Sequence, residues 1–170
     1  MLRWIIRPVR LLIESLRDEE SPHLLALGLT LGMVAGLVPK DNLTATVLAT
    51  LLLTVRLHLG AAAAAALIFT WVGMLADPLA HRLGLALLTW KPAEVILSRL
   101  FDLPFVPWTN LNNTVVLGNL LLGLLLSWPM YWASKRSIEQ FGPLLVAYLA
   151  KYRLFHVIRG AEIATSWRRR

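Results

Sequence analysis

The sequence contains no cysteine among its 170 residues. Disulfide bonds, thiolate nucleophiles and thiolate metal ligands are therefore excluded within this chain. Charged residues are also few, at 16%, whereas hydrophobic residues reach 57% and the mean hydropathy is +0.63. Soluble domains are about 25% charged and about 45–50% apolar. A water-soluble core does not explain this excess, so we predict an all-α integral membrane protein.

Recognisable catalytic motifs are missing as well. The four histidines are dispersed along the chain, and there is neither a zinc-protease motif nor a nucleophile elbow. We therefore expect no enzymatic activity, no metal ion and no cofactor.

Positive charge is concentrated at the two ends of the chain. The net charge is +7, but no nucleic-acid-binding motif accompanies it, so nucleic acid is not an expected partner. Basic residues that flank apolar segments mark the cytoplasmic side of a bacterial inner membrane, and we predict a multi-pass protein with both termini there. The residues expected to bind anionic phospholipid headgroups are Arg3, Arg7, Arg10, Lys151, Arg153 and Arg159.

Both ends have the pattern of amphipathic helices. Residues 1–20 place apolar side chains at helical spacing, with arginines and Glu14 on the other face. This pattern fits either an interfacial helix on the cytoplasmic leaflet or an amphipathic helix packed on protein. Residues 136–170 form a basic tail that we interpret as a second surface helix.

Four apolar segments lie between these ends, at residues 21–39, 42–56, 57–76 and 114–134. The first has 19 uncharged residues, enough to cross a hydrocarbon core of about 30 Å, but the second has only 14 residues before Arg56. Residues 21–57 therefore either cross twice or form a re-entrant helical hairpin, which gives two to four crossings in all. Both alternatives return the chain to the side on which it started.

The connection at residues 77–113 is predicted to lie outside the membrane on the opposite side. Because proline disfavours a helical conformation in the residue before it, we expect the third segment to end at Asp77-Pro78. The apolar spacing of residues 79–103 indicates two short surface helices, broken near Lys91-Pro92. Residues 104–108 then form an aromatic turn that favours the membrane interface.

Three glycines, Gly28, Gly32 and Gly36, recur every four residues in the first apolar segment. Residues at this spacing share one face of a helix, and glycine lets another backbone approach closely. We predict that these glycines form a groove for helix packing.

Polar residues interrupt the apolar segments at three places. The bend at Lys40-Asp41, between the first two apolar segments, forms either a solvated turn or an intramembrane charge pair on a substrate path. Asp77 and His81 have the spacing of an acid–base or ligand pair, but Pro78 between them favours a helix start that Asp77 caps. The asparagines near the last segment either bond to neighbouring helices or receive a lipid headgroup or a partner backbone. These candidate site residues are Lys40, Asp41, Asn42, Asp77, His81, Asn112, Asn113 and Asn119.

The stretch from Ser21 to Pro39 reads S-P-x3-A-L-G-x3-G-x3-G-x2-P and resembles a widespread bacterial membrane family catalogued as a domain of unknown function. The motifs D-P-L-A-H-R-L-G at residues 77–84 and N-N-T-V-V-L-G at residues 112–118 resemble a narrower subgroup of about this length. Residues 40–42 depart from the bend usual in the family, often an aromatic residue and glycine followed by leucine. The resemblance implies no established activity. Members of the subgroup are often encoded beside a larger membrane-anchored protein with a long periplasmic part, which implies a partner subunit in envelope lipid transport.

The leading hypothesis is a non-enzymatic inner-membrane subunit or scaffold of an envelope complex, with membrane phospholipids and a large periplasmic protein as partners. The alternative is a small transporter or lipid-translocating protein with a broken-helix site at Pro39–Asn42. A third reading, an intramembrane enzyme that uses Asp77 and His81, is the weakest because no catalytic motif supports it. Self-association into a homo-oligomer is left open.

Overall fold

The computed structural model describes residues 21–151, which are helical and contain no strand. The all-helical part of the predicted fold is confirmed. The elements in chain order are α2 (Ser21–Leu37), α3 (Leu43–Thr54), α4 (Leu59–Leu88), α5 (Lys91–Phe101), the 3-10 helix η1 (Val106–Thr109) and α6 (Thr114–Lys151). The predictions for residues 1–20 and for the end of the tail lie outside the described residues, and so do the headgroup contacts of Arg3, Arg7, Arg10, Arg153 and Arg159.

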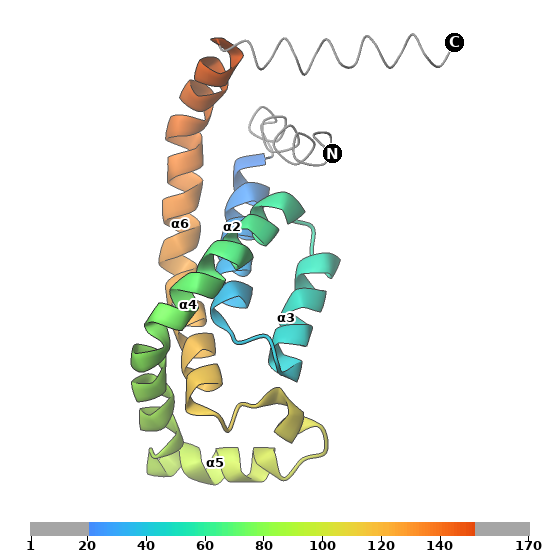
Figure 1. Cartoon of the computed structure of the whole chain (residues 1–170), viewed down its shortest axis with the longest axis vertical. Coiled ribbons are helices and arrows are strands. Elements are labelled where there is room, and N and C mark those ends of the chain that lie inside the picture. The colour runs from blue at the N-terminus through green and yellow to red at the C-terminus, as the bar shows by residue number, and fades with distance from the viewer. Residues whose placement is uncertain (1–20, 152–170) are drawn as a thin grey trace, which may run out of the picture.

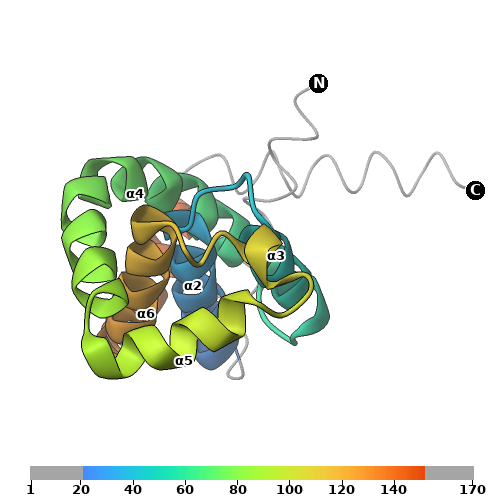
Figure 2. The same cartoon turned by 90° about the horizontal axis from the view of Figure 1, so that it is seen from below.

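The helix α2 lies at the centre of the bundle (Figures 1 and 2). It packs against both α4 and α6, and α3 runs back beside it as the second arm of a helical hairpin. The helix α5 lies across one end of the bundle, and the start of α2 and the end of α6 both lie toward the other end. The central position of α2 follows from its sequence, because a helix that is apolar on every side has no face to offer to water.

The described core consists mainly of α2 and the residues that meet it. Met33, Val34 and Leu37 are buried together, and Phe69 of α4 and Leu120 of α6 pack against them. The helix α2 thus packs extensively on both α4 and α6, which also pack on each other.

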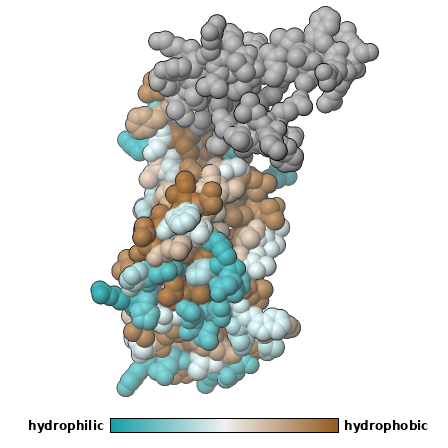
Figure 3. All heavy atoms as spheres, in the orientation of Figure 1, coloured by the Kyte–Doolittle hydropathy of each residue, from teal (hydrophilic) through white to brown (hydrophobic). Residues whose placement is uncertain are grey.

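The outer surfaces of α4 and α6 are strongly hydrophobic. Both helices are long and apolar enough to cross a membrane, and only 22% and 28% of their most apolar windows are buried inside the protein. A core helix of a soluble protein is mostly buried, whereas these helices expose large apolar side chains. In Figure 3 hydrophobic atoms cover much of the visible face, and hydrophilic atoms gather toward the end that carries α5. The most exposed of these side chains include Leu67, Ile68, Leu75, Leu125 and Trp128.

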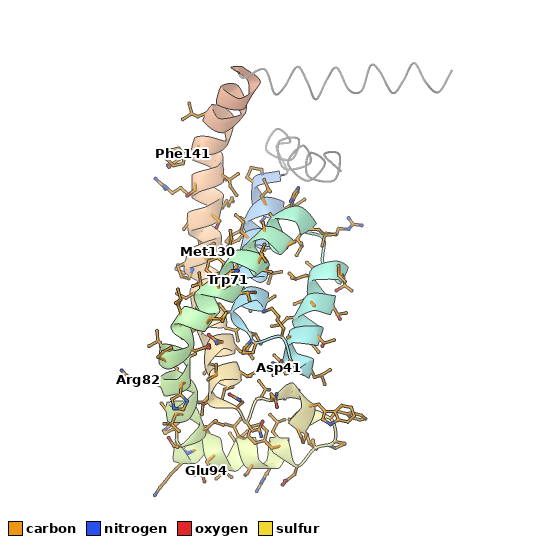
Figure 4. The ribbon with its side chains drawn as sticks, in the orientation of Figure 1. Asp41, Trp71, Arg82, Glu94, Met130 and Phe141 are labelled. Carbon is orange, nitrogen blue, oxygen red and sulfur yellow. The ribbon has the colours of Figure 1, made fainter. Side chains whose placement is uncertain are left out.

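The predicted helix end at Asp77-Pro78 is wrong, because α4 continues through Pro78 to Leu88. Proline inside a helix removes one backbone hydrogen bond and bends the helix without always ending it. Figure 4 shows the result: Trp71 lies on an oblique half of α4 and Arg82 on a second half with a different direction. Asp77 is therefore inside a helix and does not cap one. The chain breaks at Thr89 and Trp90 instead, immediately before α5.

The helix α6 does not end where the last apolar segment ends. It continues to Lys151, and its residues 136–151 belong to the stretch that the sequence pattern assigned to a separate basic tail. Charged side chains do not break a helix, and Lys135 and Glu139, one turn apart, approach to 3.9 Å. Lys151, predicted to bind a headgroup, is the last residue of α6.

Candidate functional site

Gly28, Gly32 and Gly36 lie against the first half of α4. A Cβ atom at Gly28 would come within 2.7 Å of the carbonyl oxygen of His58, and one at Gly36 would come equally close to that of Ala66. No real Cβ contact is this short, so α2 and α4 approach as closely as two backbones allow. The glycine groove is filled by α4 of the same chain and offers no free surface to another protein.

The helices α4 and α6 also approach each other closely, in the half of α4 that follows its bend at Pro78. Gly118 of α6 packs on the backbone of Ala80, and Gly84 of α4 packs on the backbone of Thr114, each without room for a Cβ atom. These contacts bring the polar side chains of the two helices into hydrogen-bonding range.

A hydrogen bond between side chains of α4 and α6 joins Asp77 to Asn119. The Asn119 side-chain amide donates a hydrogen bond of 2.9 Å to the Asp77 carboxylate. Asn119 is fully buried, and its side-chain oxygen has no hydrogen-bond partner among the described residues. A buried oxygen without a partner costs about 1–3 kcal/mol, so this position is unusual in a packed helix interface.

His81 follows Asp77 by one helical turn and also faces α6. Its Nδ1 atom lies 2.6 Å from the hydroxyl oxygen of Thr114. Each of the two α4 residues is thus bonded to a residue of α6, and the structure shows no hydrogen bond between Asp77 and His81 themselves. This geometry does not form the acid–base pair that their spacing suggested. We call Asp77, His81, Thr114 and Asn119 together the α4–α6 polar strip.

The turn between α2 and α3 is built by its own polar residues. The Lys40 ammonium group donates hydrogen bonds of 2.8 Å to the carbonyl oxygens of Ala35 and Gly36 and a further bond to that of Val38. A positive charge is favourable at a helix C-terminus, where carbonyl groups have no helical partner. Lys40 therefore closes the end of α2, and its ammonium is held by carbonyl groups instead of by Asp41, which is exposed (Figure 4).

Asn42 begins α3 as its N-cap. Its side-chain oxygen accepts a hydrogen bond of 2.8 Å from the backbone nitrogen of Ala45, and its amide donates one of 2.7 Å to the carbonyl oxygen of Pro39. These two bonds fix the sharp reversal of the chain. Asn42 thus has a structural role that its residue type indicates, because asparagine is a preferred N-cap.

The tip of the hairpin is held in place by two neighbours. Val38 is fully buried together with Ala45 and Val116, the last from the first turn of α6. On the other side, the Thr44 hydroxyl donates a hydrogen bond of 2.8 Å to the carbonyl oxygen of Thr109 in η1. The tip is therefore fastened to α6 and η1, above the layer formed by α5 and η1 (Figure 1), while Lys40 and Asp41 remain exposed.

The other two asparagines lie at the start of α6. Asn113 is exposed, and its side-chain oxygen accepts a hydrogen bond of 2.9 Å from the backbone nitrogen of Val115. Asn112 is exposed beside it. Of the candidate site residues, the structure thus brings together Asp77, His81 and Asn119 in the polar strip. The polar residues of the hairpin tip and those at positions 112 and 113 form two other groups outside this strip.

One contact was not predicted from the sequence. His23, near the start of α2, lies with its Nδ1 atom 2.6 Å from the Tyr131 hydroxyl of α6, and the two rings meet edge to face with their centroids 5.7 Å apart. Nothing in the linear sequence marks a pair that is 108 residues apart.

Within residues 21–151 no group of three or more histidine, aspartate or glutamate side chains is placed to hold a metal ion. What the described arrangement provides is a set of close backbone contacts and a polar strip in which Asn119 is buried and His81 is exposed.

Comparison with known families places the chain among bacterial proteins. Residues 7–141 match the family described as "Uncharacterized protein conserved in bacteria (DUF2062)". The chain belongs to this family. The DUF2062 match covers the hairpin, the polar strip and nearly all of the apolar part of α6, so these features lie inside the family region.

A curated relative of this DUF2062 chain is found in Treponema pallidum (strain Nichols), where it is named "Uncharacterized protein". The two are 24% identical over 159 residues, which is 94% of this chain and 98% of the relative. The two proteins therefore have similar lengths. No solved structure matches the chain.

Proposed function

We propose that this chain is a multi-pass inner-membrane subunit without catalytic activity, which supports an envelope complex. The observation that carries the proposal is the exposure of large apolar side chains on α4 and α6, two helices of sufficient length to cross a bilayer. Exposed apolar surface of this extent is stable only against lipid or another apolar partner.

In this proposal α4 and α6 cross the membrane, and α2 and α3 form a re-entrant hairpin. At about 1.5 Å per residue, the 17 residues of α2 and the 12 of α3 reach about 25 Å and about 18 Å, less than the hydrocarbon core of about 30 Å. The anchoring of the tip on α6 and η1 supports a hairpin whose tip is held by the protein. In this arrangement both chain ends lie on one side of the membrane. We take this side to be the cytoplasmic one, because basic residues flank the apolar segments there.

The partner surface in this proposal is the outer face of α3. Only Ala45 of α3 is buried, whereas Val47, Leu51 and Leu53 are exposed. Thr46 and Thr50 donate their hydroxyl hydrogens to carbonyl oxygens one turn back, so they present small surfaces that allow a close helix approach. Since α4 already fills the glycine groove, the anchor helix of a larger periplasmic protein fits better on α3 than on α2.

Site-specific photo-crosslinking in cells tests this assignment. A photoreactive residue at Val47 should form a covalent adduct with a membrane-anchored protein that has a large periplasmic part. The matched control is Leu125 of α6, which is equally apolar and 68% exposed. Adducts with lipid alone at both positions, or equal protein adducts at both, would count against a partner on α3.

A transporter or lipid-translocating protein is the second candidate, and one observation favours it. The buried, unpartnered oxygen of Asn119 beside Asp77 is the kind of polar feature that marks a path through a membrane protein. In that case water reaches the hairpin tip from both sides during the cycle. Cysteine at position 40 would then react with small thiol reagents from either side of sealed vesicles, whereas the subunit proposal expects reaction from one side at most.

A further inference from the structure

The helix α5 has an apolar flank that nothing in the described structure covers. None of its residues is buried. One side of the helix is half-buried against the bundle and carries Ala93, Leu97 and Phe101. Ile96, on another side, is 69% exposed. The polar residues Lys91, Glu94 and Ser98 occupy the side opposite Ile96 and Leu100. The helix therefore has one side on the protein, one polar side and one free apolar flank.

The direction of α5 distinguishes it from the other helices. Figures 1 and 2 show α5 lying across the end of the bundle, crosswise to α6. If α4 and α6 cross the bilayer, α5 lies parallel to the membrane surface. Thr114 to Ser134, the uncharged part of α6, is 21 residues or about 31 Å long, which matches the hydrocarbon core and places its lower end close to α5.

Aromatic residues stand at both ends of α5. Trp90 precedes it and is 60% exposed, and Phe105 and Trp108 follow it at 66% and 67%. Phe105 has a φ of 72°, a left-handed conformation that is strained for a bulky residue, and its ring meets Trp108 edge to face at 5.6 Å. The turn thus holds two large rings away from the protein at an energetic cost. Tryptophan and other aromatic rings held in this way are typical of membrane–water interfaces.

From these observations we infer that α5 and the 103–108 turn form an in-plane anchor in the interface of the leaflet opposite the basic termini, with the apolar flank of α5 against the acyl chains. This inference rests on the proposed membrane crossing of α4 and α6. The occupant is lipid because exposed aromatic rings flank α5 at both ends, and Leu85, in the last turns of α4 before it, is also an exposed apolar residue. The charges of Lys91 and Arg99 are balanced by Glu94 and Asp102, so the contact depends on apolar and aromatic burial and not on anionic headgroups.

Spin labels on single cysteines provide the test, since the chain has no cysteine of its own. Full-length Ile96→Cys and Ser98→Cys proteins are reconstituted in vesicles of phosphatidylethanolamine and phosphatidylglycerol. Collision with oxygen, which is concentrated in hydrocarbon, is compared with collision with a water-soluble nickel complex. We expect oxygen to dominate at position 96 and nickel to dominate at position 98. The pair Leu100→Cys and Glu94→Cys repeats the comparison at two other exposed positions.

Three outcomes overturn the anchor. If labels on both faces collide mainly with the nickel complex, α5 lies in water. If the label at position 96 collides rarely with either reagent, protein covers the flank. Dominance of oxygen at both faces would mean that the whole helix is immersed. A label at Leu125 separates this result from the membrane proposal: if it is in hydrocarbon while position 96 is in water, only the anchor fails, and if it is in water, the crossing of α6 fails as well.

Discussion

The side-chain amide of Asn119 lies 2.9 Å from the carboxylate of Asp77, across the interface of α6 and α4 and 42 residues apart in the sequence. This bond lies at the bend of α4, where Asp77 precedes Pro78, next to the contact of Gly118 with the Ala80 backbone. It connects the two helices that we propose to cross the membrane.

Replacement of Asp77 by leucine should destabilise the bundle by about 1–3 kcal/mol, because the buried side-chain amide of Asn119 loses its acceptor and its oxygen has no partner among the described residues either. Thermal unfolding in mild detergent measures the change. The double variant Asp77→Leu with Asn119→Leu removes both polar groups and should recover much of the loss. An Asp77→Leu protein as stable as the parent would show that the bond contributes nothing.

Substitution of Gly118 by alanine should also destabilise the protein, by about 1–3 kcal/mol, because the new Cβ atom meets the backbone of Ala80, which cannot move without separating α4 from α6. Gly60→Ala is the matched control. Its Cβ would meet only side-chain atoms of His58, the nearest at 3.1 Å, and alanine favours a helix over glycine by up to about 1 kcal/mol. We expect Gly60→Ala to keep or raise the melting temperature, and equal losses at both positions would contradict the packing described.

The hairpin tip gives a third prediction. Asn42→Ala removes the N-cap of α3 and should cost about 1 kcal/mol, whereas Asn42→Asp keeps the oxygen that accepts from Ala45 but loses the donor to Pro39, so it should recover only part of this loss. The same unfolding measurement applies, together with hydrogen exchange at the Ala45 amide. Unchanged exchange at Ala45 in Asn42→Ala would mean that the cap does not hold the turn.

Replacement of Lys40 should lower the stability of the end of α2 by a smaller amount. Lys40→Met removes the ammonium that bonds to the carbonyl groups of Ala35 and Gly36, so the last turn of α2 should open more readily, at a cost of about 0.3–1 kcal/mol. Lys40→Arg keeps a donor and the charge and serves as the control. Asp41→Asn should change little, because Asp41 is exposed and the Lys40 ammonium is held by carbonyl groups. A larger loss from Asp41→Asn than from Lys40→Met would show that the charge pair matters after all.

The helical architecture was predictable because long uncharged stretches leave few alternatives to a helix in an apolar medium. The end of the third segment was not predicted correctly, since Pro78 signals a helix end by local rules and the contacts of Ala80 and Gly84 with α6 override that signal. Asp77 and His81 share one face of α4 because that helix continues, whereas the sequence favoured a helix start capped by Asp77. Their partners Asn119 and Thr114 required knowledge of which helices meet, and that depends on tertiary packing alone.

The central claim is that hydrocarbon surrounds α4 and α6. Leu75 of α4 tests it most directly, because its side chain is 84% exposed and it lies within the apolar window of that helix. A spin label on Leu75→Cys in reconstituted vesicles should collide frequently with oxygen and rarely with the water-soluble nickel complex. Ready access of the nickel complex to this position, in protein that is folded by its melting transition, would contradict the account.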